Sequence, residues 1–125
     1  MKLTRQRAAV LAALAGHEGF VGAQHLHEDI LGGGDSVGLA TVYRSLTALV
    51  DAGEVDAIRG LDGETLYRAC ARREHHHHLV CTGCGKTVEI DGPTVEAWAS
   101  AVASDHGFTD IGHTVELWGT CSRCQ

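Results

Sequence analysis

The chain has 125 residues, 44% of them hydrophobic and 5% aromatic, which suits one ordinary domain or two small ones with an aliphatic core. No apolar run is long enough to span a membrane, and the N-terminus lacks the apolar segment of a signal peptide, so we expect a soluble, cytoplasmic protein. The net charge of −6 argues against a nucleic-acid partner. This argument is weak, because residues 1–73 are nearly neutral, with 8 Lys or Arg and 9 Asp or Glu.

The first half of the chain predicts three helices. The first begins after Thr4, a good N-cap, and ends at Gly16. The second covers residues 23–31 and stops at a run of glycines. The third extends from Leu39 to Ala52 with apolar residues at helical spacing.

Two short alternating runs follow these helices, Val55–Arg59 and Glu64–Ala69, joined by a glycine-containing turn. This pattern predicts a β-hairpin. Three helices and a hairpin in about 70 residues are typical of a winged helix-turn-helix, in which the third helix enters the major groove of DNA. A small α+β interaction domain with no DNA partner explains this half equally well.

The second half predicts a smaller mixed domain. Strands are expected at His76–Cys81, Thr87–Ile90 and Ile111–Gly119, with a helix from Pro93 to His106 between the last two. So short a segment has a marginal core. We therefore expect an α+β fold: a winged helix followed by a small α/β domain that bound zinc stabilises.

Two Cys-x-x-Cys pairs carry the strongest chemical signal. Cys81 and Cys84 form one pair, and Cys121 and Cys124 form the other. Two such pairs in a short chain are typical of a tetrahedral structural zinc site. Disulfides would require an oxidising compartment and would leave a fifth cysteine over, and a redox dithiol needs only one pair at a helix start.

Four consecutive histidines, His75–His78, precede the first cysteine pair. Four thiolates already complete the zinc site, so the histidines need other partners. Side chains alternate between the two faces of a strand, which gives two imidazoles to each face. Each face then supplies half of a tetrahedral site, and the chain is expected to bind more than one metal ion.

Three stretches together resemble the ferric uptake regulator family. Gly38–Arg44 with the following Leu46 and Asp51–Gly53 is similar to its recognition helix, and His75–His78 with Cys81-x-x-Cys84 is similar to its metal-binding core. The terminal cysteine pair matches its second zinc clip. The resemblance implies a homodimeric repressor that binds palindromic, double-stranded operator DNA when loaded with metal. It implies a winged-helix domain at residues 1–71 and a metal-binding dimerisation domain at residues 72–125.

The resemblance also supplies partners for one face of the histidine run. Asp56 and Cys70 stand where zinc uptake regulators have ligands near the inter-domain hinge. The iron-sensing pattern departs here, because its histidine falls on Phe20 and its glutamate on Arg68. A thiolate among four ligands suits zinc better than iron(II) or manganese. The implied hinge sensor zinc has the ligands Asp56, Cys70, His76 and His78.

For the other face, the family pattern adds a glutamate and a histidine. A lone histidine on an otherwise apolar strand is more often a hydrogen-bonded core residue, and only the matching partners make it a ligand here. The implied additional zinc has the ligands His75, His77, Glu96 and His113. The remaining histidines, His17, His25, His27 and His106, are expected to bind no metal.

The DNA contacts also follow from the resemblance. Tyr43 and Arg44 match the recognition-helix pair that family members direct at bases, and Thr41 is placed to reach a phosphate. Lys2 and Arg5, just before the first helix, are expected to contact the DNA backbone or the minor groove. The alternative is that Tyr43 packs in the core, but Val42 fits the apolar stripe better.

These observations predict a zinc-responsive transcriptional repressor of zinc uptake and homeostasis genes, with up to three Zn²⁺ per chain and no small organic substrate. One alternative keeps the fold but senses iron, nickel or peroxide. A zinc hydrolase needs an open coordination position and a general base, whereas each predicted site has four protein ligands, so we expect no enzyme. A zinc-stabilised interaction module would lack salt-dependent DNA affinity.

Overall fold

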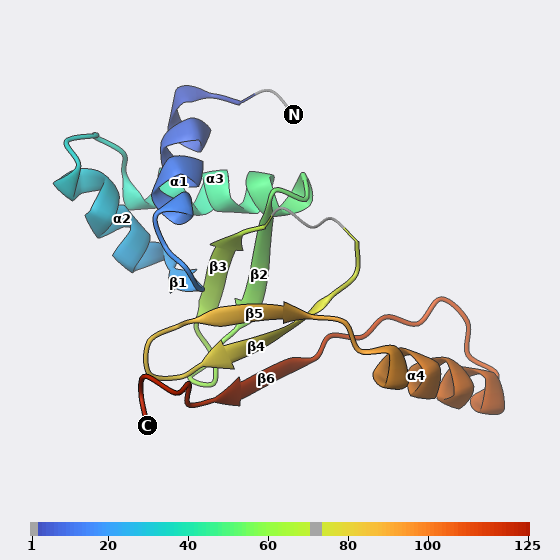
Figure 1. Cartoon of the computed structure of the whole chain (residues 1–125). Helices are drawn as coiled ribbons and strands as arrows, with labels where there is room; N and C mark the ends of the chain where they lie inside the picture. The colour runs from blue at the N-terminus through green and yellow to red at the C-terminus, as the bar shows by residue number, and fades with distance from the viewer. Residues whose placement is uncertain (1–2, 71–73) are drawn as a thin grey trace. The chain divides into compact units, whose positions relative to one another are not determined.

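A computed structural model of the chain describes residues 3–70 and 74–125. The chain forms two compact units, Met1–Arg73 and Glu74–Gln125, and each contains its own three-stranded sheet (Figure 1). Helices and strands both contribute, so the α+β class predicted from the sequence is confirmed. No helix in the described residues is both long and apolar enough to cross a membrane.

The N-terminal unit contains the three predicted helices, α1 (Arg5–Ala15), α2 (Ala23–Gly32) and α3 (Leu39–Asp51). The Thr4 hydroxyl accepts a hydrogen bond from the backbone N–H of Arg7 at 3.2 Å, which is the predicted N-cap. The helices meet in an aliphatic core whose fully buried members include Val10, Leu14, Leu26, Leu46 and Leu49. Burial of each such side chain stabilises the fold by about 1.5–3 kcal/mol, so this unit has a core of its own.

The predicted hairpin is also present. Strands β2 (Val55–Arg59) and β3 (Thr65–Ala69) pair antiparallel, and a short strand β1 (Val21–Gly22) joins the other edge of β3. The turn closes through a 2.7 Å hydrogen bond from the N–H of Gly60 to the carbonyl of Glu64. Strand β1 was not predicted, because two residues are too few to display a strand period.

The C-terminal unit contains a sheet with strand order β5-β4-β6 and one long helix. Along the chain, this helix lies between β5 and β6. Strands β4 (His77–Cys81) and β5 (Thr87–Ile90) are antiparallel, whereas β6 (Glu116–Gly119) runs parallel to β4. Helix α4 (Pro93–His106) begins with a proline and ends before Gly107, which has a left-handed φ of 73°. These positions agree with the sequence-based prediction.

The start of the last strand was predicted wrongly. The strand begins at Glu116, not at Ile111, because its neighbour β4 begins at His77 and Glu116 already pairs with His78. Val115 still accepts a 3.5 Å hydrogen bond from the N–H of His78, but residues 111–114 would lie opposite residues that precede β4. They form an extended connection that brings His113 from the end of α4 towards the sheet.

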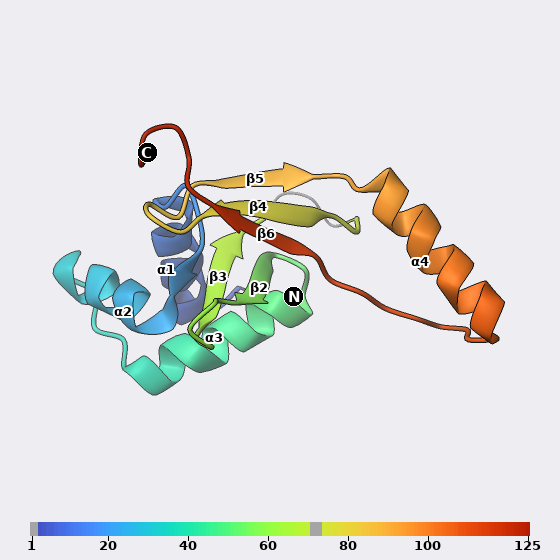
Figure 2. The same cartoon turned by 90° about the horizontal axis from the view of Figure 1, so that it is seen from below.

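The C-terminal unit contains almost no apolar core. Among its described residues, the buried hydrophobic ones are Val80, Cys81 and Ala103. Figures 1 and 2 show why: α4 extends beyond one end of the sheet and does not cover a face. Ala103 is the one buried residue of this fully described helix. This unit therefore needs stabilisation from outside its own hydrophobic contacts.

Candidate metal centres and DNA-binding surface

The four predicted zinc-binding cysteines converge at one end of the C-terminal sheet. Cys81 ends β4 and Cys84 lies in the turn that follows, whereas Cys121 and Cys124 come from the turn after β6. All four sulfur atoms lie within 4.8 Å of one another, and the Sγ atoms of Cys84 and Cys121 are 3.7 Å apart. Sulfurs placed 2.3 Å from a tetrahedral zinc would be roughly 3.8 Å apart, so the donor set fits zinc. All five cysteines, each within the described residues, are free thiols.

The backbone around this cluster favours thiolates. The N–H groups of Cys121 and Gly83 each donate to the sulfur of Cys81 at 3.3 Å. Backbone hydrogen bonds, that from Cys121 first, lower the pKa of the Cys81 thiol to about 5. Hydrogen bonding to the neighbouring Cys121 sulfur raises the pKa of Cys124 to about 12. A divalent cation bound by all four sulfurs would displace the proton of the Cys124 thiol.

The two glycines of the first turn have separate roles. Gly85 has a left-handed φ of 81° and its N–H closes the turn onto the carbonyl of Cys81 at 2.9 Å. A Cβ added to Gly83 would lie 3.1 Å from the Cys124 sulfur. Gly83 is therefore the residue that lets the second cysteine pair approach the first.

The predicted additional zinc ligands also come together. The side-chain oxygen Oε1 of Glu96, in the first turn of α4, lies 2.9 Å from His75 Nε2, 2.7 Å from His77 Nε2 and 2.9 Å from His113 Nε2. The Nε2 atoms of His75 and His113 are 3.1 Å apart. Three imidazole nitrogens that surround one carboxylate oxygen present four donors at the spacing of a tetrahedral metal site.

Electrostatics and burial at this cluster agree with a cation site. Hydrogen bonds, from His77 first and then from His113, lower the pKa of Glu96 to about 2, so its carboxylate is ionised at neutral pH. His77 is 2% exposed, and its Nδ1 atom has no hydrogen-bond partner among the described residues. Gly92 lies against its ring, since a Cβ there would be 3.2 Å from His77 Cδ2. The four side chains thus fit zinc.

The predicted hinge ligands are held in two pairs, one in each unit. In the N-terminal unit, Asp56 on β2 lies opposite Arg68 on β3. Cys70 follows two residues after Arg68, and its N–H donates to the carbonyl of Glu54 at 3.2 Å. Because alternate residues of a strand share a face, Asp56 and Cys70 lie on the same face of the hairpin. One carboxylate and one thiol are therefore available together.

In the C-terminal unit, the rings of His76, just before β4, and His78, in β4, meet edge to face with centroids 4.8 Å apart. Two carboxylates that the sequence-based reasoning missed approach them. Glu89 Oε1 lies 3.8 Å from His76 Nε2, and Glu116 Oε1 lies 3.7 Å from His78 Nδ1. The missing information was strand register, since Glu89 and Glu116 both pair with His78 across the sheet. The alternation of side chains along β5 predicts which face of the sheet Glu89 is on, but it does not identify the strand that pairs with β5.

The predicted DNA contacts in α3 are accessible. Tyr43 is 47% exposed, whereas Val42 beside it is fully buried, as the sequence predicted. Arg44 is exposed, and its guanidinium donates to the Thr41 hydroxyl at 3.0 Å. These three side chains therefore occupy the solvent side of the helix.

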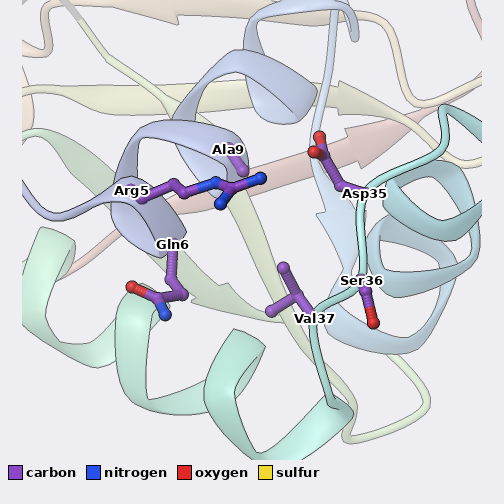
Figure 3. Close-up of a pocket in the computed structure, with 6 residues that line it drawn as sticks. All are labelled: Arg5, Gln6, Ala9, Asp35, Ser36 and Val37. Carbon is purple, nitrogen blue, oxygen red and sulfur yellow. The ribbon is translucent and has the colours of Figure 1, made fainter.

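The other two predicted DNA contacts are in the N-terminal segment. Arg5 is the first residue of α1 and lies within the helix, not before it as expected. Figure 3 shows its side chain lining a pocket between α1 and Asp35–Val37, the segment that precedes α3. Lys2 lies outside the described residues.

The chain is similar to known metal regulators along almost its whole length. Residues 1–118 match the model of the ferric uptake regulator family. The zinc uptake regulation protein of Mycobacterium tuberculosis is 46% identical over 126 residues, which cover 100% of this chain and 95% of that protein. The ferric uptake regulation protein of Campylobacter jejuni is 33% identical and is covered to 80%, with 99% of this chain aligned.

Solved structures agree with these sequence matches. The crystal structure of a zinc uptake regulator from M. tuberculosis is 47% identical with a TM-score of 0.55, over 97% of this chain and 93% of that one. A zinc uptake regulator complexed with zinc and DNA is 25% identical with a TM-score of 0.82, over 99% of this chain and 83% of that one. The chain therefore belongs to the ferric uptake regulator family, whose members are metal-responsive transcriptional regulators and not enzymes.

Proposed function

We propose that this chain is a zinc-responsive repressor that binds palindromic operator DNA as a zinc-loaded homodimer and controls genes of zinc uptake and homeostasis. The main support for this proposal is the chemical nature of the side chains that would bind the metal. Two of the three proposed sites contain cysteine, and the third contains three histidines and one carboxylate. Thiolate and imidazole sets of four ligands favour zinc over iron(II) or manganese. Similarity to zinc uptake regulators supports the same conclusion.

Up to three zinc ions per chain are proposed. The four cysteines would hold a structural zinc, and His75, His77, Glu96 and His113 would hold an additional one. The hinge zinc would be held by Asp56, Cys70, His76 and His78. Glu89, which lies next to His76, is a further oxygen donor for that site.

Exposed apolar side chains support the homodimer. Leu79, Val88 and Leu117 pair with one another across the three strands of the C-terminal sheet, and each is more than 40% exposed. On α4, Trp98 and Val102 are also exposed. Exposed apolar side chains on a unit with almost no core of its own are typical of a subunit interface. A second copy of the chain would cover it, so residues 72–125 would be the dimerisation domain.

Residues 1–71 would bind DNA. Helix α3 presents Tyr43 and Arg44 to solvent at mid-length, and the β2–β3 hairpin has the position of a wing. In a dimer, two such helices must match successive major grooves, which lie about 34–36 Å apart. Thr41, Arg5 and Lys2 would contact the phosphate backbone or the minor groove.

The hinge ligands would supply the switch. Asp56 lies in β2 and Cys70 directly follows β3, whereas His76 directly precedes β4 and His78 lies in it, the first strand of the proposed dimerisation domain. When these four side chains share one cation, the two domains are held in a single arrangement. The DNA-competent arrangement is then favoured by the difference in zinc affinity between the two states, as thermodynamic coupling requires.

Replacing Arg44 with alanine should weaken operator binding by about 1–3 kcal/mol, as expected for an arginine that reads a base. Tyr43→Ala should have a similar effect. The zinc content should not change, because neither residue is a proposed zinc ligand. DNase footprints at equal protein concentration check this, with Thr47→Ala, another exposed position of α3, as the matched control. Wild-type footprints for Arg44→Ala would contradict the assigned role.

Replacing His113 with alanine should weaken zinc-dependent operator binding only in part. All four ligands of this site lie within the C-terminal unit. Loss of the site should therefore change the zinc concentration needed for binding without removing the response. A zinc titration against labelled operator measures this shift, and complete loss of the zinc response in a folded dimer would contradict it.

A further inference from the structure

Three side chains converge in the N-terminal unit, and two of them are histidines that were expected from the sequence to bind no metal. His17 lies in the loop after α1, and His25 and Asp29 lie one turn apart on α2. Each offers a donor atom, and these atoms lie within 4.8 Å of one another. Two imidazoles and a carboxylate are common ligands of zinc.

The geometry resembles that of the histidine and glutamate cluster in the C-terminal unit, because one carboxylate faces several imidazole rings. Asp29 Oδ2 lies 2.7 Å from His17 Nε2, and Asp29 Oδ1 lies 3.7 Å from His25 Nε2. The two rings are 5.4 Å apart and nearly perpendicular. Both carboxylate oxygens are thus directed to different imidazoles, and small side-chain rotations would allow one cation to contact all three residues.

Both elements that carry the ligands are anchored independently of any cation. On α2, Leu26 and Ile30 are buried in the core, which leaves His25 and Asp29 on the outer face. The loop is fixed by a 3.0 Å hydrogen bond from the N–H of His17 to the carbonyl of Leu14. The fold therefore brings the donors together at little additional entropic cost.

We propose that His17, His25 and Asp29 form a further binding site for a divalent cation of the zinc type, separate from the three sites above. Three protein ligands leave coordination positions open to water. The side chains are 28%, 63% and 39% exposed and supply three ligands, one fewer than each site above, so the site is expected to bind more weakly and to fill after them. His17 lies within hydrogen-bond length of Asp29, whereas His25 is 3.7 Å from it, which is close to the separation of about 3.3 Å between two ligands of one tetrahedral zinc.

A cation held here would link the loop after α1 to α2. That loop is also tied to the wing strand, because Arg68 Nε donates to the carbonyl of Glu18 at 3.4 Å. Occupancy at high zinc would then stabilise the winged-helix unit against unfolding, since a ligand that binds only the folded state raises its stability. The inference does not depend on the hinge site or on operator binding.

The test is the zinc stoichiometry of the full chain as free zinc is raised, measured by equilibrium dialysis and elemental analysis. The variants are His25→Gln and Asp29→Asn, and the matched control is His106→Gln, an exposed histidine at the end of α4. Histidine ring NMR of the same samples identifies which imidazoles bind. We expect wild type and His106→Gln to bind one more zinc per chain than either variant, with ring shifts at His17 and His25.

Equal stoichiometry in wild type and His25→Gln would overturn the proposal, and so would loss of the last zinc from His106→Gln. Unshifted His17 and His25 rings at saturating zinc would do the same. Zinc-dependent operator binding is measured in parallel at low free zinc, where this site is empty. The proposed function therefore stands or fails on that separate result.

Discussion

Replacing Cys81 with serine is expected to unfold the C-terminal unit and abolish dimerisation. The unit has few buried apolar residues, and its one long helix buries only Ala103, so hydrophobic contacts alone cannot stabilise it. Structural zinc contributes on the order of 10–16 kcal/mol in small metallodomains. Loss of the Cys81 sulfur removes a ligand and also the acceptor of the N–H groups of Gly83 and Cys121.

The measurements are zinc content, far-ultraviolet circular dichroism and mass from light scattering. Cys124→Ser should behave in the same way, because it removes a ligand from the other turn. Ser122→Ala, between the two cysteines of that turn, is the matched control and should remain a zinc-loaded dimer. If the Cys81→Ser, Cys124→Ser double variant stayed folded and dimeric at ambient temperature, the stabilising role of this zinc would be wrong.

Replacing Cys70 with alanine has the largest expected effect on function. The variant should fold, dimerise and keep its structural zinc, because Cys70 is not one of the four clustered cysteines. It should nevertheless lose zinc-dependent operator binding, because the proposed hinge set loses its only thiolate. Allosteric coupling of this kind is typically 5–150-fold in affinity, and that factor should disappear.

A zinc titration of Cys70→Ala against labelled operator measures the loss directly. Thr65→Ala, at an exposed residue of β3, the strand that precedes Cys70, is the control and should respond as wild type. His113→Ala in the same experiment should keep a reduced response. A wild-type zinc response in Cys70→Ala would remove the hinge site from the mechanism.

Much of the fold followed from local sequence signals. Thr4, Gly53 and Gly107 mark helix ends, and the structure places each at such an end. Helix periodicity also identified the buried face of α3, including Val42 and Leu46. Cysteine spacing predicted which four sulfurs meet, because each pair lies on a single tight turn.

The errors and omissions arose where distant segments meet. The last strand starts late because β4, its partner, starts late, and parallel pairing of these strands leaves no local signal. Glu89 and Glu116 approach the histidines through strand register, which one sequence does not encode locally. His17 meets Asp29 through the packing of a loop on α2. These features depend on tertiary contacts, and spacing rules could not supply them.

The most direct test of whether the protein is a zinc-responsive repressor is to measure its operator affinity as a function of buffered free metal. The probe is a fluorescent operator selected from random DNA with the zinc-loaded protein, and the protein retains its structural zinc throughout. Zinc should promote binding at free concentrations at which iron(II) and manganese(II), tested without oxygen, do not. Tight binding with iron(II) together with no response to zinc would contradict a zinc-responsive repressor.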